Sequence, residues 1–138
     1  MKLFLLLFLV SCALVPVRKD PRLQPYVEMF EVYSGLKVDM PVVFGQLKEP
    51  VVGICYGFRT PWIFRTVVID RDYFMSVPNC IKKFVILHEL AHCVLDKDHI
   101  RMLRIHGFYE PMSVMNPTVD WRFCDFEAYY IEKLFRKL

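Results

Sequence analysis

Apolar positions along the chain follow helical spacing in some segments and strand-like runs in others. Between Arg22 and Gly35 they recur three or four residues apart, which predicts a helix that ends at the glycine. β-Branched and aromatic residues then gather in short runs bounded by glycines, which is typical of strands. These runs cover residues 42–44, 51–56 and 62–69.

Helical spacing returns in the second half of the chain. We expect a helix over about 77–94, with Ser76 as its N-cap and one apolar stripe. The stripe consists of Phe84, Leu87, Ala91 and Val94. Residues 99–116 show mixed periodicity and predict an irregular connection, whereas residues 125–138 predict a closing amphipathic helix. This order of elements predicts an α+β fold, with a short twisted sheet of three or more strands packed against helices.

The first ten residues, MKLFLLLFLV, are apolar except for one lysine. Spanning a bilayer takes about 20 apolar residues, so this shorter run is typical of a signal peptide. The sequence LVSC at residues 9–12 resembles a bacterial lipobox, in which the cysteine is lipidated. We therefore expect a lipoprotein signal peptide over 1–11, lipidation of Cys12, a tether over 12–20 and one domain over 21–138. This predicts an exported protein anchored to a membrane of the bacterial cell envelope. Secretion after cleavage at Ala13 is the alternative.

Length and composition narrow the class of protein further. A chain of 138 residues is enough for one domain, which we expect to be a monomer. The net charge is +3 and no run of basic residues occurs, which argues against nucleic-acid binding. Besides Cys12 there are four cysteines, Cys55, Cys80, Cys93 and Cys124. They could form two disulfides in any of three pairings, or remain free thiols.

Residues 88–92 read HELAH, with two histidines four apart on the expected helix. Side chains at this spacing project from the same face, so the imidazoles of His88 and His92 can reach one zinc ion. Glu89 lies at the rim of that face, where it can take a proton from a zinc-bound water and return it to a leaving amine. The pattern predicts zinc-dependent hydrolysis of peptide bonds, with Glu89 as the general base.

A zinc protease needs a third protein ligand and leaves one coordination position open. Asp98 and His99 follow the helix closely, and Glu127 lies on the final helix. The preference of zinc for imidazole favours His99. Asp98 is the alternative ligand, or else an acceptor that orients a ligating ring. The remaining candidates are His106, expected on a surface loop, and the tyrosines Tyr109, Tyr129 and Tyr130, expected to pack in the fold or to act as oxyanion donors.

Two motifs in order resemble those of the metzincin metalloproteases. Residues 88–99, HELAHCVLDKDH, resemble the metzincin pattern HExxHxxGxxH, and residues 112–117, MSVMNP, resemble its Met-turn. Small bacterial metallopeptidase-like lipoproteins are similar in having a cysteine after the second histidine, as Cys93 here, and an IDxDY segment before the helix, as at residues 69–73. The similarity runs from the third strand to the C-terminus. It implies a metzincin-like domain with Met115 as an apolar floor beneath the imidazoles.

One position departs from the metzincin pattern, because Leu95 replaces the glycine that turns the chain after the helix. A β-carbon in a left-handed conformation costs about 1–2 kcal/mol, so we expect the turn to be made differently. An altered turn can absorb one extra residue. It therefore again favours His99 over Asp98, in agreement with the similar bacterial proteins.

The function expected from these patterns is that of a zinc endopeptidase acting on peptide or protein substrates and held at a membrane through Cys12. A catalytically silent, zinc-binding envelope lipoprotein that serves as an adaptor is the alternative. The presence of Glu89 argues against it, because an adaptor has no use for a general base.

Overall fold

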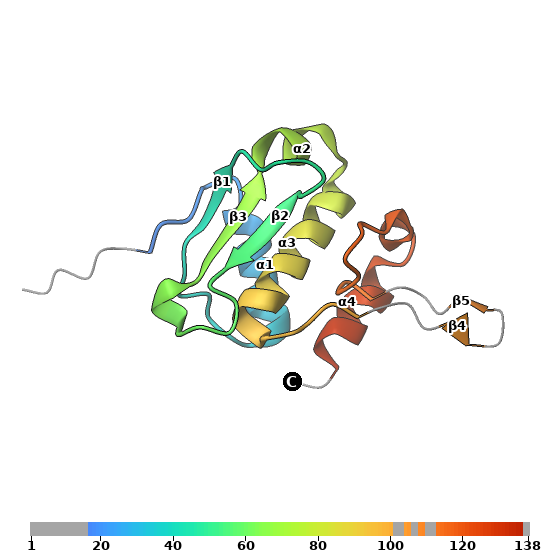
Figure 1. The fold of residues 1–138 in the computed structure, drawn as a ribbon. Coiled ribbons are helices and arrows are strands. Elements are labelled where there is room, and N and C mark those ends of the chain that lie inside the picture. Colours follow the sequence, from blue (N-terminus) through green and yellow to red (C-terminus); the bar gives the residue numbers. More distant parts are fainter. Residues whose placement is uncertain (1–16, 101–103, 106–107, 110–112, 137–138) are drawn as a thin grey trace, which may run out of the picture.

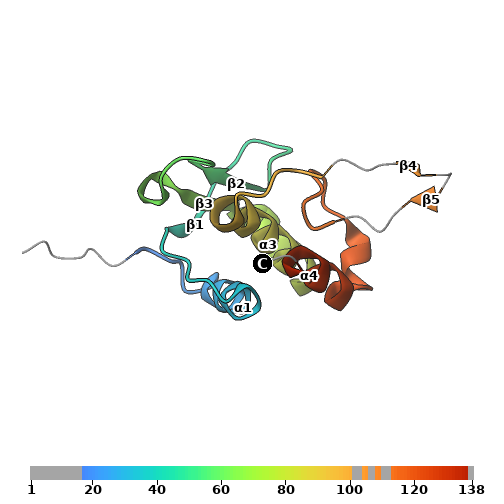
Figure 2. The ribbon, with the colours of Figure 1, turned by 90° about the horizontal axis from the view of Figure 1, so that it is seen from below.

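The structure is a computed structural model that describes residues 17–100, 104–105, 108–109 and 113–136. The expected signal peptide, Cys12 and His106 lie outside the described residues. The domain is a small α+β unit in which helices pack on one face of a three-stranded sheet, as Figures 1 and 2 show. The α-helices are α1 (Gln24–Ser34), α2 (Arg71–Ser76), α3 (Asn79–Leu95) and α4 (Glu127–Phe135). The strands of the sheet are β1 (Val42–Gly45), β2 (Gly53–Tyr56) and β3 (Thr66–Asp70).

The sheet is mixed, with the strand order β1–β3–β2. β1 runs parallel to β3, with Val42 opposite Val67, and β2 runs antiparallel to β3, with Gly53 opposite Ile69. Val67 and Ile69 are fully buried while the residues on either side of them are not. This alternation places one face of β3 in the core. β2 lies at an edge of the sheet, as the strand order shows.

Helix α3 lies at the centre of the domain, between the sheet and the outer helices (Figure 2). All of its residues from 84 to 94 are buried. The prediction of a single apolar stripe was therefore incomplete, because β2 and β3 contact one side of α3 while α1 and the 3-10 helix η2 (Trp121–Cys124) contact others. His88 and His92 consequently lie inside the protein and not on an outer face.

Helix ends agree with the prediction in one place and differ in another. α1 ends as predicted at Gly35, which has φ 70° and donates its N–H to the Glu31 carbonyl over 2.9 Å. Ser76, however, is not the N-cap of α3. It closes α2, an additional short helix that begins where the Asp70 carboxylate accepts the N–H of Tyr73 over 2.8 Å. The sequence DRDY carried this capping signal, which the periodicity did not reveal.

The predicted strand over 62–69 was wrong in its first half. Trp62–Phe64 forms a 3-10 turn, η1. In this turn the Pro61 carbonyl accepts the Phe64 N–H, and the Trp62 carbonyl accepts the Arg65 N–H. The ladder with β2 ends at Thr66, so the residues before it have no strand to pair with. The high β-propensity of Trp62–Phe64 comes from large side chains that are exposed here, and it does not mean that these residues pair in the sheet.

The remaining boundaries shift by a few residues. β2 begins at Gly53 and not at residue 51, because the Val51 N–H closes a turn onto the Lys48 carbonyl over 3.0 Å. The closing helix begins at Glu127 after η2, two residues later than predicted. The connection after α3 contains a short ladder between β4 (Arg104–Ile105) and β5 (Phe108–Tyr109). Among the described residues, no helix has the length and apolar character to cross a membrane.

Candidate metal centre

Three histidines meet at one point beside α3. Nε2 of His88 lies 3.0 Å from Nε2 of His92 and 3.0 Å from Nε2 of His99. One ligand atom from each ring lies within 4.8 Å of the others, so the group could hold a metal ion. His88 and His92 are buried, whereas His99 is exposed. The two helical histidines are thus fixed by the core, and His99 approaches them from the solvent side.

Backbone carbonyls orient the two buried rings. Nδ1 of His88 lies 2.6 Å from the Val114 carbonyl oxygen, and Nδ1 of His92 lies 2.5 Å from the Lys97 carbonyl oxygen. A carbonyl only accepts, so each Nδ1 carries the hydrogen and each Nε2 keeps its lone pair for a metal. Burial lowers the pKa of His88 to about 4 and also lowers the pKa of His92. Both effects favour the neutral imidazole, which is the form that binds metals.

Asp98 does not take part in this arrangement. Its carboxylate forms an ion pair with the guanidinium of Arg59, and both side chains are exposed. The role of orienting a histidine ring, which was one of the two alternatives for Asp98, belongs instead to the carbonyls of Val114 and Lys97. Of the two adjacent candidates, His99 is the residue that the structure brings to His88 and His92.

The turn after α3 explains why the later residue arrives at the site. Leu95 keeps the helical conformation, and Asp96 takes the left-handed one with φ 51° and ψ 31°. The Asp96 N–H donates to the Ala91 carbonyl and closes the helix. As expected from the missing glycine, the turn is made differently, with the left-handed residue one position after Leu95. The chain then leads His99 back toward the helix.

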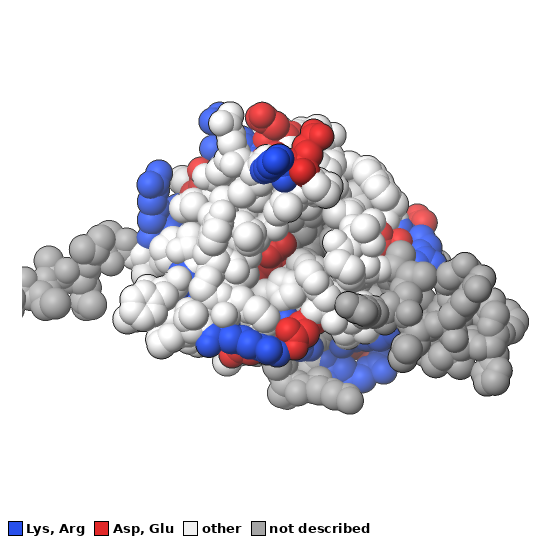
Figure 3. Space-filling model, in the orientation of Figure 1, with Lys and Arg blue, Asp and Glu red and all other residues white. Residues whose placement is uncertain are grey.

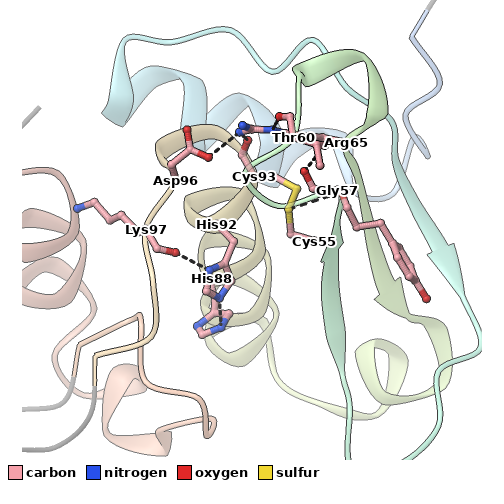
Figure 4. Close-up of a disulfide and its surroundings, with 10 residues drawn as sticks. Cys55, Gly57, Thr60, Arg65, His88, His92, Cys93, Asp96 and Lys97 are labelled. Atoms are coloured by element: carbon pink, nitrogen blue, oxygen red, sulfur yellow. Dashed lines mark hydrogen bonds and ion pairs between the residues drawn. A yellow bond between two sulfur atoms is a disulfide. The ribbon is translucent and has the colours of Figure 1, made fainter.

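Arg65 holds this turn in place, as Figure 4 shows. Its guanidinium donates to the Cys93 carbonyl over 2.6 Å and to the Thr60 carbonyl over 2.7 Å, and it lies 3.0 Å from the Asp96 carboxylate. Arg65 is only 5% exposed, so these contacts satisfy a buried charge. They also satisfy a carbonyl left free at the helix end. Sequence reasoning missed Arg65, because nothing near it in the sequence marks it as part of the site.

Glu89 lies beside the histidines with its carboxylate buried. The Cys55 N–H on β2 donates to it, and burial raises its pKa to about 7. A β-carbon on Gly53 would lie 2.7 Å from Cγ of Glu89 and 2.9 Å from Oε1. Glycine at this point of β2 therefore makes the space in which the carboxylate lies.

Two disulfides join elements around the site, and they settle the pairing that the sequence left open. Cys55 bonds to Cys93, which ties β2 to α3 next to His92 (Figure 4). Cys80 bonds to Cys124, which ties the start of α3 to η2. Cys93 is therefore neither a free thiol nor a metal ligand. The first disulfide links the strand that contacts Glu89 to the helix that carries Glu89.

Met115 lies in a tight turn that contacts the site. Its side chain is buried, and its carbonyl accepts the N–H of Ile100, the residue after His99, over 2.9 Å. The preceding residue, Val114, provides the carbonyl that orients His88. This turn therefore connects two of the three histidines through the backbone. The role of an apolar floor beneath the imidazoles, which the resemblance implies for Met115, stays a prediction.

The other candidate site residues lie outside the histidine group or make contacts that stabilise the fold. Glu127 binds Nζ of Lys83 over 2.5 Å and is not part of the histidine group. The Tyr130 hydroxyl is buried and donates to Asp120 over 2.8 Å, and the Tyr129 ring packs edge-on against the Tyr130 ring. Both tyrosines thus have packing contacts in the fold, which was the first expectation for them. For Tyr109 the structure describes only the backbone.

The histidines and Glu89 lie between two cavities. One has a volume of about 250 Å³, and its walls include Val52, Phe84, Val85, Pro117 and Val119. The other has a volume of about 340 Å³, and its walls include Ile54, Phe58 and His92. Glu89, His99 and Gly53 line both. Figure 3 shows acidic atoms within a hollow near the middle of an otherwise largely uncharged face.

Comparison with protein-family models, with curated protein sequences and with solved structures found no match for this chain. The description of the protein therefore rests on its own fold and site. The chain is a small α+β domain with a three-histidine group that could hold a metal ion.

Proposed function

We propose that this protein is a zinc-dependent endopeptidase of the metzincin type. The observation that carries the proposal is the convergence of three histidine Nε2 atoms beside the buried carboxylate of Glu89. Three imidazoles suit zinc and leave a fourth coordination position open, as in catalytic sites. A structural zinc site takes four protein ligands, and the described residues offer three.

In the proposed reaction, the metal and the side chains of the protein have different roles. When bound, zinc supplies a Lewis acid and lowers the pKa of water to about 7. The carboxylate of Glu89 accepts a proton from the attacking water and passes it to the leaving amine. The Cys55 N–H and the space at Gly53 hold that carboxylate at the floor shared by the two cavities. Its position can therefore stay fixed through both proton transfers.

The surroundings of the site favour an extended peptide as the substrate. β2 is an edge strand, and an extended chain can add to such an edge by backbone hydrogen bonds. The walls of the smaller cavity are mostly apolar, which suits an apolar side chain next to the cleaved bond.

We also propose that the protein is exported and anchored to a membrane through Cys12. Two disulfides support export, because disulfides persist mainly in oxidising compartments. The apolar run over residues 1–10 and the LVSC sequence support lipid attachment. Secretion without an anchor is the alternative.

Replacing Glu89 with glutamine should abolish cleavage without removing the metal. General acid–base catalysis contributes about 10²–10⁴-fold, and the amide cannot accept the proton. The measurement compares Glu89→Gln with wild type for hydrolysis of unfolded casein and for zinc content per chain. Chelation should stop the wild-type reaction, and added zinc should restore it.

Glu127→Gln is the matched control, because this glutamate pairs with Lys83 and is not part of the histidine group. It should cleave casein at the wild-type rate. A wild-type protein that binds zinc stoichiometrically but cleaves neither casein nor a broad peptide library would contradict the proposal. That result would favour the silent adaptor instead.

A further inference from the structure

The end of β2 and its connection to β3 expose several large apolar side chains. Tyr56 is 50% exposed, Trp62 39%, Ile63 84% and Phe64 65%. We call these four residues the apolar rim. Large apolar side chains that are exposed together mark a surface for another molecule, because exposing them to water is unfavourable.

The rim is held rigidly by the structure behind it. Trp62–Phe64 is a 3-10 turn closed by the N–H groups of Phe64 and Arg65. The buried guanidinium of Arg65 fastens the end of that turn to the Thr60 and Cys93 carbonyls. The backbone of this segment is thus held in one conformation, which lowers the entropic cost of binding.

The described chain begins at the same end of the sheet. Lys19 pairs with Val42 in a parallel bridge, and Val42 pairs with Val67, just after the rim. Because that bridge is parallel, residues 17–18 lie at the end of the sheet where β3 starts, which is also the end that carries the rim. Figures 1 and 2 both show the start of the described chain and the β2–β3 connection on the same side of the domain. The residues upstream include the apolar run and Cys12.

The charges at this end suit a lipid headgroup region. Arg18 is exposed there, and the nearby charges form pairs, Arg59 with Asp98 and Arg65 with Asp96. Tryptophan and other aromatic residues favour the membrane–water interface, where arginine contacts anionic headgroups.

We propose that the apolar rim lies on a lipid bilayer, with Trp62, Ile63 and Phe64 inserted at headgroup level. The proposal rests on the membrane anchoring proposed above, and it adds a second point of contact that sets the orientation of the domain. A protein partner fits less well, because a specific protein interface takes about 20–30 residues a side and the rim has four. The rim also lies outside the walls of both cavities at the histidine site, so it is not part of the cleft.

Tryptophan fluorescence can test the proposal, because the chain has only two tryptophans. Trp121→Phe leaves Trp62 as the reporter, whereas Trp62→Phe leaves Trp121, which is 57% exposed on η2, away from the rim. Protein expressed from the complete sequence is reconstituted with vesicles of phosphatidylethanolamine and phosphatidylglycerol that carry brominated acyl chains. Trp62 should lose at least about half of its emission and shift to the blue, whereas Trp121 should keep nearly all of its emission.

Sedimentation of the same samples separates the two proposals. If the protein sediments with vesicles but Trp62 is quenched no more than Trp121, the anchor stands and the rim proposal is wrong. If the protein does not sediment with vesicles, the anchoring proposal fails and the rim proposal fails with it, while casein cleavage still tests the enzyme separately. If Trp62 is shielded from acrylamide without lipid and the protein sediments as a dimer, the rim belongs to a second copy of the chain.

Discussion

Replacing His99 with alanine should lower zinc affinity by at least about a hundredfold. Replacing a residue that only orients a metal ligand already lowers metal affinity by about 10–100-fold. His99 itself provides one of the three converging nitrogens. His88 and His92 would remain, but two imidazoles hold zinc much less tightly than three. Competition with a chromophoric chelator measures the affinity, and absorption of the cobalt form reports the coordination number.

Asp98→Asn is the matched comparison on the neighbouring residue. Its carboxylate is exposed and pairs with the exposed Arg59, and such pairs contribute little. We expect zinc affinity to change less than about threefold. If alanine at His99 leaves the affinity unchanged while asparagine at Asp98 removes it, the third ligand is Asp98, in the strict metzincin register.

Removing either disulfide should lower the free energy of unfolding by about 4 kcal/mol, from loop-closure entropy. The loops are of similar size, with sequence separations of 38 and 44 residues. The double variants Cys55→Ala/Cys93→Ala and Cys80→Ala/Cys124→Ala should therefore lose similar stability, measured by urea unfolding of the zinc-free protein.

Their effects on the site should differ. The Cys55–Cys93 bond joins the strand whose N–H binds Glu89 to the residue next to His92, so its loss should also lower kcat for casein cleavage and weaken zinc binding. The Cys80–Cys124 bond lies at the other end of α3 and should leave both quantities near wild type under conditions where the variant is folded. Equal losses of kcat in the two variants would show that the first disulfide acts on stability alone.

Much of the fold was predictable because local signals agree with the tertiary structure. Gly35 ends α1 as the sequence indicates, and the helix with His88 and His92 lies within two residues of its predicted bounds. The first half of the strand predicted over 62–69 was misassigned for a physical reason. Trp62, Ile63 and Phe64 have strand-like composition, but composition does not reveal whether a neighbouring strand is available for pairing.

The sequence likewise indicated some residues of the candidate site and not others. Two histidines and Glu89 follow from spacing on one helix, and Leu95 at the expected glycine correctly indicated a changed turn. Arg65 and Gly53 could not be predicted, because each acts on a residue more than twenty positions away in the sequence. The disulfide pairing was likewise open, since three pairings fit the same four cysteines until the fold brings β2 beside α3.

The Cys55–Cys93 bond can form only after the chain has been synthesised and folded, so the site reaches its final structure late. Folding brings the two sulfur atoms together, but an external oxidant must join them. A newly synthesised, reduced chain therefore holds Glu89 and His92 less firmly than the oxidised protein does. If the chain is the exported protease proposed above, oxidation after export would protect the cytoplasm from proteolysis, as a removable propeptide does in zymogens. Activation would leave no cleaved fragment and would be reversible by reduction.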